Sequence, residues 1–412
     1  MTLPESTTTP RITAEGVEAL RRKIGIDWPY SRWSTWNEEA SRDGIRHYAF
    51  GFGDDNPLWW DPEHAASSRW GGIVAPPLYL ECAGISPRVV LSDEQRRDRS
   101  SGGLPGLSMF WAGDRVRFFA PVHEGDRIGV RRFYMDVKEK ASSGTFGATV
   151  MSVRRRVYTN QAHRLVAVWD ADFVHAEPKP AGTVDGKQRA EQHVYTDDEL
   201  AAIDAAYDAE TVRGAEPRHV ESVRVGDELP GLVKGPLTVS DMIAWLQGAG
   251  RYELYPYRLQ YRNRRRAPAF LYPRNSFGAH EPMLRGHYDS AFARSLGLSG
   301  PYDFGAMRAA WMVQLVTDWM GDDAVVVQLH DRMLHFTGVG DVVTIRGSVI
   351  AIRDADGWPQ VECAVTCANR LGEPIATATI QVRLPSRSNG LPGYPAPPDD
   401  GGLLPNMPPV AE

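Results

Sequence analysis

Three residues of this sequence are candidates for catalysis because of their type and their position: Asp54, His287 and Gly305. A carboxylate and an imidazole can move protons near neutral pH, because histidine titrates there and burial tunes a carboxylate toward it. Gly305 precedes an apolar stretch with helical spacing, so its N–H is expected to point outward from a helix N-terminus. Such an N–H stabilises a negatively charged oxygen, and glycine leaves room for the group that carries it. These residues predict acid–base chemistry beside a polarised carbonyl.

The same residues and their neighbours also have structural explanations. Asp54 lies in the run GDDNPLWWDPEH, where an aspartate before Asn-Pro commonly caps the following turn. Asp61 precedes a proline and Asp289 precedes a helical stretch, so both are expected to be helix N-caps. His287 is equally explained as a satisfied surface imidazole in a polar loop.

A cluster of basic and aromatic residues stands out against an otherwise acidic sequence. Guanidinium groups bind phosphate in a bidentate manner, so the cluster is a candidate phosphate clamp. A solvated basic face explains it equally well, and one short cluster does not make a nucleic-acid-binding domain. The cluster comprises Arg262, Arg264, Arg265, Arg266 and Arg274, interleaved with Tyr261, Phe270 and Tyr272.

The same order of elements occurs twice along the chain. In residues 43–176 a polar loop leads to an apolar helix expected from about Pro77, and runs rich in β-branched and aromatic residues follow. In residues 217–384 a helix is expected over 306–320, again followed by such runs. We interpret the chain as a diverged duplication. The expected strands lie within 115–122, 126–140, 146–159, 164–176, 333–339, 341–354, 360–370 and 374–384.

Three further segments complete the predicted organisation. Residues 1–42 form an N-terminal extension. Residues 177–216 are a polar linker with a short acidic helix around Asp197 to Ala209. Residues 385–412, rich in Pro and Gly, are expected to be a loosely held tail.

The pattern predicts the α+β class. A long apolar helix needs a curved apolar surface to lie against, and a twisted antiparallel sheet supplies one. One such unit leaves a sheet edge uncovered, so two units side by side are expected to share a continuous sheet.

The first half carries a specific resemblance. The run YAFGFGDDNPLWWDPEHAA, followed by GGIVAPP, resembles the dehydratase segment of MaoC-like proteins and is similar to the dehydratase region of type I fatty acid synthases. The resemblance implies a tandem, or double, hotdog fold, in which each half is a long helix wrapped by a sheet. The family signature G-D-x-N-P-L-H keeps its aspartate here as Asp54 and has Trp59 in place of its histidine. Trp59 implies that the pocket of the first half binds rather than reacts.

The second half departs from the signature in the opposite sense. Its run HYDSAFARSLGLSGPYDFGAM resembles the segment between the signature histidine and the glycine that opens the central helix. That match implies His287 as the histidine and Gly305 as the glycine. Counting back from His287 puts Pro282 at the aspartate position, with Glu281 and His280 as the nearest polar substitutes. The counterpart of Gly305 in the first half falls in Ala75-Pro76-Pro77, where the prolines have no N–H to donate.

The resemblance implies a hydro-lyase that reversibly hydrates a 2-enoyl-CoA to a 3-hydroxyacyl-CoA, with R preference and with no metal or other cofactor. The acyl-CoA is then the expected binding partner, and a homodimer or a heteromer with another MaoC-like chain is the expected assembly. The predicted catalytic residues are Asp54, His287, Gly305 and Glu281, and the predicted substrate-binding residues are Asn56, Trp59, Arg264, Arg265, Arg266 and Arg274.

Two other functions fit the same resemblance. The chain is alternatively a non-catalytic acyl-binding subunit of a heteromeric MaoC-like dehydratase, since neither half has the complete Asp/His signature. A hotdog thioesterase is the second alternative, and it needs a carboxylate aimed at the thioester from the long helix. A site pooled from Asp54 and His287 is disfavoured, because pseudo-symmetry puts equivalent loops on opposite sides of the fold.

Bulk composition excludes several other classes of protein. The 412 residues carry a net charge of −6, so nucleic acid is not an expected partner. No apolar run approaches the roughly 20 residues that span a membrane. The N-terminus lacks the pattern of a secretory signal, which favours a cytoplasmic location. Cys82, Cys363 and Cys367 lack metal-ligand spacing and are expected to be buried thiols.

Overall fold

A computed structural model describes residues 10–28, 37–87, 89–100, 103–140, 147–177, 193–250, 254–265, 271–296 and 298–398. Its strands are β1 (Ser108–Phe118), β2 (Gly129–Lys140), β3 (Thr149–Thr159), β4 (Leu165–Ala176), β5 (Glu228–Lys234), β6 (Val325–Met333), β7 (Val343–Ala355), β8 (Trp358–Ala368) and β9 (Pro374–Arg383). Its helices are α1 (Ala14–Arg21), α2 (Arg42–Phe52), α3 (Pro57–Trp60), α4 (Pro62–Ser67), α5 (Asp93–Ser100), α6 (Asp197–Asp208), α7 (Val239–Ala249), α8 (Tyr257–Arg264), α9 (Ser290–Ser295) and α10 (Gly305–Met320), with short 3₁₀ turns η1 (Pro77–Glu81), η2 (Val220–Ser222) and η4 (Met283–His287).

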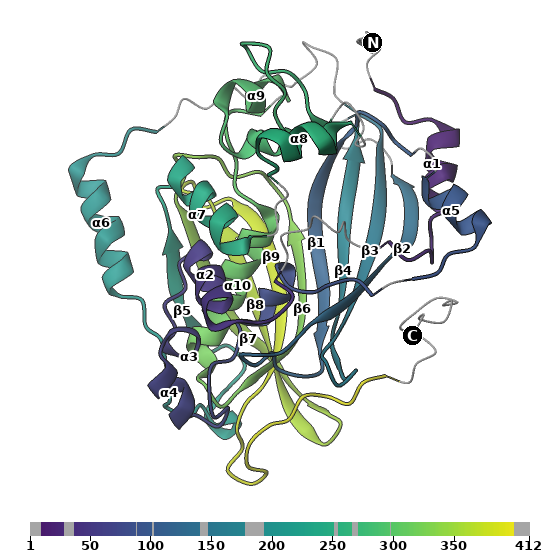
Figure 1. Cartoon of the computed structure of the whole chain (residues 1–412). Coiled ribbons are helices and arrows are strands. Elements are labelled where there is room, and N and C mark those ends of the chain that lie inside the picture. The colour runs from purple at the N-terminus through teal and green to yellow at the C-terminus, as the bar shows by residue number, and fades with distance from the viewer. Residues whose placement is uncertain are drawn as a thin grey trace.

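The strands form one continuous antiparallel sheet. Its order is β2-β3-β4-β1-β6-β9-β8-β7-β5, so each half keeps its strands together. The halves join where β1 pairs with β6, with Val116 opposite Leu329. The predicted shared sheet and the α+β class are confirmed (Figure 1).

Helix α10 is the central element of the second half. Every residue from Ala306 to Met320 is buried, because the sheet curves around the helix and other segments cover its outer side. Gly321, at φ 78°, ends the helix in a conformation that suits glycine. The predicted helix over 306–320 and the place of Gly305 at its start are confirmed.

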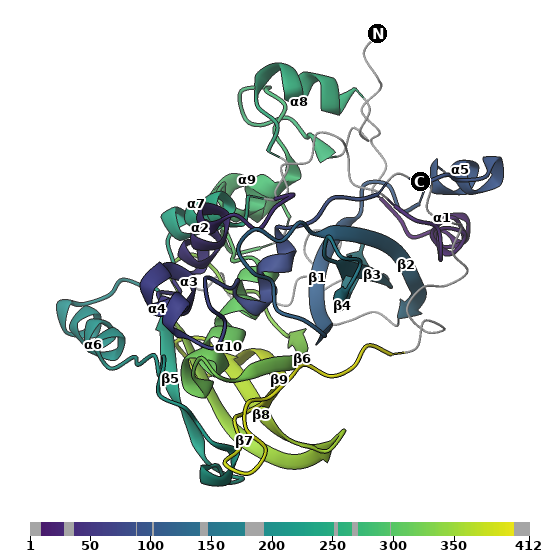
Figure 2. The ribbon, with the colours of Figure 1, turned by 60° about the horizontal axis from the view of Figure 1, so that its bottom comes forward.

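The long helix predicted from about Pro77 in the first half is wrong. The chain makes only the 3₁₀ turn η1 there, and Gly84, at φ 109°, follows shortly after it. An added Cβ at Gly84 would lie 2.9 Å from Val130 Cγ1, so the backbone itself packs against β2 at this point. Figure 2 shows the strands of the second half curving around α10, whereas β1–β4 enclose no comparable helix.

Two helices outside the sheet reveal the duplication more clearly than the sequence does. Helices α2 and α7 pack against each other through Gly51 and Gly248, where an added Cβ on Gly51 would lie 3.1 Å from Gly248 Cα. Both helices end at a glycine with positive φ, Gly53 at 73° and Gly250 at 60°. Equivalent positions of the two halves therefore meet at this crossing.

Three smaller predictions also need correction. The run 333–339 is not a strand, because β6 lies earlier, at Val325–Met333. Strand β5 was not predicted at all. Part of the expected loose tail is anchored: Ser386 Oγ donates to Glu221 Oε1 at 2.7 Å, and Tyr394 packs against the main core. The described tail residues, 385–398, thus belong to the folded body.

Several local predictions are confirmed. Asp61 accepts hydrogen bonds from the N–H groups of Glu63 and His64, and Asp289 accepts one from Phe292 N–H, so both are N-caps. The acidic helix of the linker is α6. All three cysteines are buried free thiols. No helix within the described ranges is long and apolar enough to cross a membrane.

Candidate functional site

A cavity of about 690 Å³ lies on the face of β1–β4 that has no long helix. One wall is the face of those strands that carries Trp111, Phe173 and Arg154. The opposite wall is the start of α10 with the loops before it and after β6. His287 and Gly305 both line this cavity, and Asp54 does not. The two sites that the sequence left as alternatives are therefore distinguished by geometry.

His287 is fixed in orientation at the cavity wall. Its Nδ1 lies 2.8 Å from the carbonyl oxygen of Tyr302, which makes Nδ1 the protonated nitrogen and leaves Nε2 as an acceptor. The ring stacks on Phe304, with centroids 3.7 Å apart and planes 17° apart. Burial lowers the pKa of His287 to about 4, against the weaker effect of carbonyl hydrogen bonds. The imidazole is thus neutral, and it can accept a proton.

Gly305 supplies the N-terminus of a long helix to the same cavity. No side chain caps α10 at Phe304, so the first N–H groups of the helix have no side-chain acceptor. An added Cβ at Gly305 would lie 3.1 Å from Trp111 Cβ, which is tighter than ordinary contact. Glycine therefore lets β1 approach the helix start closely, and a larger residue here would displace Trp111 slightly. The unpaired N–H groups and the helix dipole favour a negatively charged oxygen here.

A buried ion pair stands next to Gly305. Arg308, one turn into α10, donates through Nε to Asp303 Oδ2 at 2.8 Å and through Nη2 to Asp303 Oδ1. Arg308 Nη1 also donates to the carbonyls of His335 and Ile375, at 2.8 and 3.0 Å. Burial raises the pKa of Asp303, and Arg308 opposes that rise. The pair connects the start of α10 to the loop after β6, and so holds the wall that carries Gly305.

Asp54 lies in a separate buried cluster. It accepts hydrogen bonds from Asn56 N–H and from Trp59 Nε1, both at 3.0 Å. Burial raises its pKa to about 6, and burial followed by the Asp54 charge raises the pKa of Asp318. Asp318 is near the C-terminal end of α10, about 20 Å from Gly305 at 1.5 Å per residue. Asp54 and His287 are not brought together.

The pocket of the first half is nearly closed. Asn56 and Trp59 line a space of only about 40 Å³, and both side chains are buried. Asn56 caps α3 through its hydrogen bond from Leu58 N–H, at 3.0 Å. Trp59 fills the place of the signature histidine and holds the Asp54 carboxylate. These contacts give the run GDDNPLWW a structural role in this chain.

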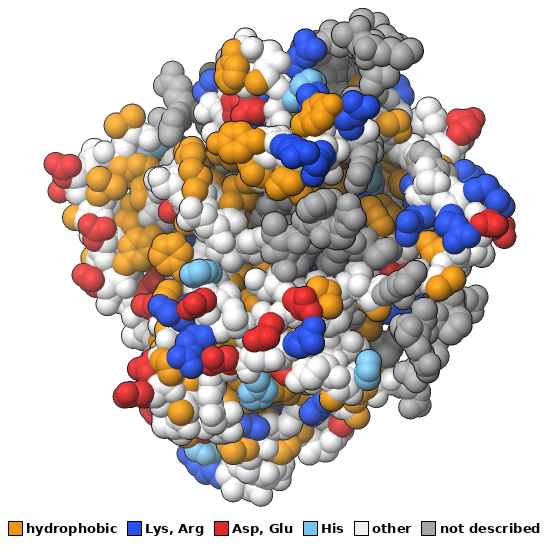
Figure 3. Space-filling model, viewed as in Figure 1, with side chains coloured by type: hydrophobic (Ala, Val, Ile, Leu, Met, Phe, Trp, Pro, Cys, Tyr) orange, Lys and Arg blue, Asp and Glu red, His pale blue; other side chains and the backbone are white. Residues whose placement is uncertain are grey.

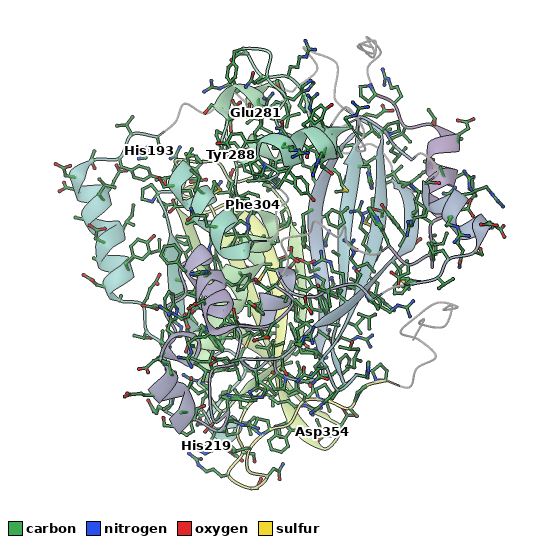
Figure 4. The ribbon with its side chains drawn as sticks, viewed as in Figure 1. His193, His219, Glu281, Tyr288, Phe304 and Asp354 are labelled. Carbon is green, nitrogen blue, oxygen red and sulfur yellow. The ribbon has the colours of Figure 1, made fainter. Side chains whose placement is uncertain are left out.

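Glu281 lies outside the cavity wall. Its Oε2 accepts hydrogen bonds from Arg285 Nη1 at 2.7 Å and from Asn275 Nδ2 at 3.0 Å. Arg285 is itself buried and lies over the Phe292 ring, 4.2 Å from its centroid. Figure 4 shows Glu281 farther from the start of α10 than Phe304. Glu281 therefore braces the turn that carries His287.

The predicted phosphate clamp is on the surface above the sheet. Arg264 and Arg265 are at the end of α8, where Arg265 Nη1 donates to Tyr261 Oη at 3.1 Å. Arg274 is exposed in the following loop, and Arg266 lies outside the described residues. Neither Arg264, Arg265 nor Arg274 lines the cavity. Figure 3 shows basic and hydrophobic side chains mixed over the part of the surface formed by α8 and α9.

The ends of α2 and α7 indicate another residue for the aspartate position of the second half. In the first half Asp54 directly follows Gly53, the C-cap of α2. The equivalent C-cap of α7 is Gly250, so the matching residue is Arg251, and an insertion separates it from His287. Arg251 lies outside the described residues. The repeated glycines at the ends of α2 and α7 are the signal that could have found this.

Sequence comparisons each match part of the chain. Residues 29–168 match the model of the FAS1-like dehydratase domain region. A UPF0336 protein of Streptomyces avermitilis is 28% identical over 129 residues, which are 31% of this chain and 79% of that protein. A UPF0336 protein of Thermobifida fusca is 28% identical over 151 residues, covering 35% and 88% of the two chains.

Solved structures resemble most of the chain. A MaoC-like dehydratase superposes with a TM-score of 0.60 at 18% identity, over 89% of this chain and 99% of that one. A putative MaoC domain protein dehydratase from Chloroflexus aurantiacus gives 0.55 at 11% identity, over 88% and 96%. A conserved hypothetical protein of Mycobacterium tuberculosis, described as a double hotdog fold, gives 0.50 at 11% identity, over 87% and 96%. The predicted double hotdog fold is confirmed, with a dehydratase-type region in its first half.

Proposed function

We propose that this chain, a double hotdog with a dehydratase-type first half, is a hydro-lyase that hydrates 2-enoyl thioesters of coenzyme A. The observation that carries the proposal is the meeting of His287 and Gly305 at one cavity, where the start of α10 is uncapped. A neutral imidazole and a helix N-terminus are the two groups that water addition to a conjugated thioester needs.

In the proposed reaction His287 serves as both base and acid. Its Nε2 takes a proton from water as the oxygen bonds to C3 of the enoyl group, and the negative charge moves to the thioester oxygen. The N–H of Gly305 donates to that oxygen. The imidazolium then returns the same proton to C2, which completes a 3-hydroxyacyl thioester. No second proton donor is required.

Electrostatics supports this division of roles. Because burial lowers the pKa of His287 to about 4, its imidazolium releases a proton to C2 more readily than an exposed imidazolium would. The developing enolate is an opposite charge close to the ring, and it raises the pKa of His287 during water attack. Water attack thus requires a higher pKa of His287, and proton transfer to C2 requires a lower one. The oxyanion raises the pKa during the first step, and burial lowers it for the second.

The alternative functions differ in what they need from α10. A thioesterase needs a carboxylate on the helix near the thioester, whereas the acid of α10 is Asp318, about 20 Å from Gly305. A non-catalytic acyl-binding subunit needs only the cavity, and it remains the second candidate because the signature aspartate has no counterpart beside His287.

The test uses the purified full chain with a panel of 2-enoyl-CoA substrates. Hydration is followed by the loss of absorbance of the conjugated thioester, and free thiol is measured in parallel. We expect hydration without thiol release. Saturable binding of the thioesters with no hydration would instead identify the chain as the acyl-binding subunit, and thiol release as a thioesterase.

Gly305→Ala is expected to reduce kcat by about 10- to 100-fold, because the added Cβ presses on Trp111 and shifts the N–H that faces the thioester oxygen. Stability should change little, since alanine favours a helix start more than glycine does. Gly300→Ala is the matched control, because nothing lies within 4 Å of its added Cβ. Equal activity of the two variants would remove Gly305 from the oxyanion site.

Asp54→Asn is expected to change kcat by less than about tenfold and to lower the free energy of unfolding by about 1–3 kcal/mol. The amide cannot accept both hydrogen bonds that the carboxylate accepts from Asn56 and Trp59. Asp55→Asn, at an exposed neighbouring position, is the control. Initial rates and urea unfolding measure the two effects. A kcat loss beyond about 100-fold in folded protein would return Asp54 to the catalytic residues.

A further inference from the structure

The cavity contains an arginine whose surroundings are unlike those of its neighbours. Arg154, on β3, has its guanidinium carbon 4.5 Å from the ring centroid of Phe173, 5.1 Å from that of Tyr134 and 5.4 Å from that of Trp28. Its Nη2 lies 2.9 Å from Met109 Sδ. Its Nε is buried and has no hydrogen-bond partner within the described ranges.

Three other arginines that line the cavity are neutralised by carboxylates, whereas Arg132 donates through Nε to the carbonyl of Trp28 at 2.9 Å. Arg155 holds Asp170 through two hydrogen bonds of 2.7 Å, Arg156 holds Glu81, and Arg308 holds Asp303. Arg154 forms no salt bridge in the part of the chain that the structure describes. A guanidinium does not lose its proton in a protein, so the positive charge of Arg154 stays in the cavity.

Nearby groups respond to this charge. Burial, followed by the charge of Arg154, lowers the pKa of His175 to about 4 and also lowers the pKa of Lys23. His175 is held by Ser152, whose Oγ lies 3.0 Å from Nε2. The positive charge of Arg154 therefore disfavours a second positive charge on His175 and favours an anion nearby.

The position of Arg154 relates it to the reacting groups. Gly305 contacts Trp111 on β1, Trp111 packs against Phe173 on β4, and Phe173 packs against Arg154 on β3. Arg154 is two strands from β1, about 10 Å across the sheet. An acyl chain that lies across the rings of Trp111 and Phe173, with its thioester at Gly305, brings its far end to the guanidinium of Arg154.

We propose that Arg154 binds an oxyanion at the end of the acyl group opposite the thioester, so that the substrates are CoA thioesters of dicarboxylic acids. The aromatic rings hold the guanidinium plane in place, and a carboxylate completes its hydrogen bonding. The inference rests on the proposed function for the placement of the thioester. The coenzyme phosphates are a second source of the same oxyanion chemistry, and the experiment separates the two.

The test measures binding without turnover, so it does not depend on hydration activity. Suberoyl-CoA and octanoyl-CoA have the same chain length and differ in their end group, carboxylate or methyl. Titration calorimetry should show about 10- to 100-fold tighter binding of suberoyl-CoA, as expected for hydrogen bonds to a charged group. Arg154→Met should abolish that preference and leave the Kd of octanoyl-CoA unchanged, while Arg154→Lys should keep part of the preference.

Two comparisons make the result decisive. Arg353→Met, at a side chain that is 73% exposed on β7, controls for the loss of a positive charge elsewhere. The corresponding N-acetylcysteamine thioesters lack phosphates and should show the same preference for the carboxylate. If Arg154→Met weakens both CoA thioesters equally and neither N-acetylcysteamine thioester, Arg154 binds the coenzyme instead. Equal binding of suberoyl-CoA and octanoyl-CoA by the unaltered chain overturns the proposal, whereas absent hydration with the preference intact overturns only the proposed reaction.

Discussion

Replacing His287 with alanine is expected to lower kcat for enoyl-CoA hydration by about 10² to 10⁴-fold, the usual contribution of a positioned general acid–base. The other described histidine that lines the cavity is His335, in the loop after β6, where Arg308 holds its backbone carbonyl. Binding of a saturated acyl-CoA should change far less. A variant that retains more than about a tenth of the original kcat would contradict the assignment of His287.

The pH dependence gives a second measurement on the same residue. Because the folded-state pKa of His287 is about 4, the acid limb of kcat/KM should lie near pH 4 and not near the ordinary value of 6.5. The folded state binds fewer protons than the unfolded state between these values. Stability is therefore lost as pH falls through that window, by up to about 1.4 kcal/mol per unit. The His287→Ala variant should lose that part of the slope.

Replacing Arg308 with methionine is expected to lower the free energy of unfolding by about 3–5 kcal/mol, because it leaves the Asp303 carboxylate buried and unpaired. The carbonyls of His335 and Ile375 lose their donors as well. Urea unfolding of the full chain measures the effect. The loss should be smaller at low pH, because burial already raises the pKa of Asp303 and removal of Arg308 raises it further.

The double variant Asp303→Asn, Arg308→Met is the control for this prediction. With the negative charge removed, much of the lost stability should return, since the penalty comes from the unpaired charge and not from the missing contact alone. A double variant as unstable as Arg308→Met would show that Arg308 acts mainly through the two carbonyls. Either result reports how the wall beside Gly305 is held.

The sequence by itself determined the elements whose causes are local. Helix α10 follows from apolar residues that recur at helical spacing, and the caps Asp61 and Asp289 depend on residues within one turn. Most strands follow from β-branched runs broken by turn residues. The signature motif also pointed to His287 and Gly305, because the histidine precedes a capped helix and the glycine opens another.

Tertiary structure alone decided which of these residues share a site. The long helix of the first half is absent because the backbone at Gly84 packs directly on β2, a contact between distant segments. That absence leaves the cavity, which Arg154 on β3 helps to line. Asp54 interacts with Asp318 near the end of α10, whereas His287 lines the cavity at the start of that helix. The two residues are therefore separated by about the length of α10. Sequence spacing specifies local geometry, whereas the meeting of the two halves depends on long-range packing that no single segment encodes.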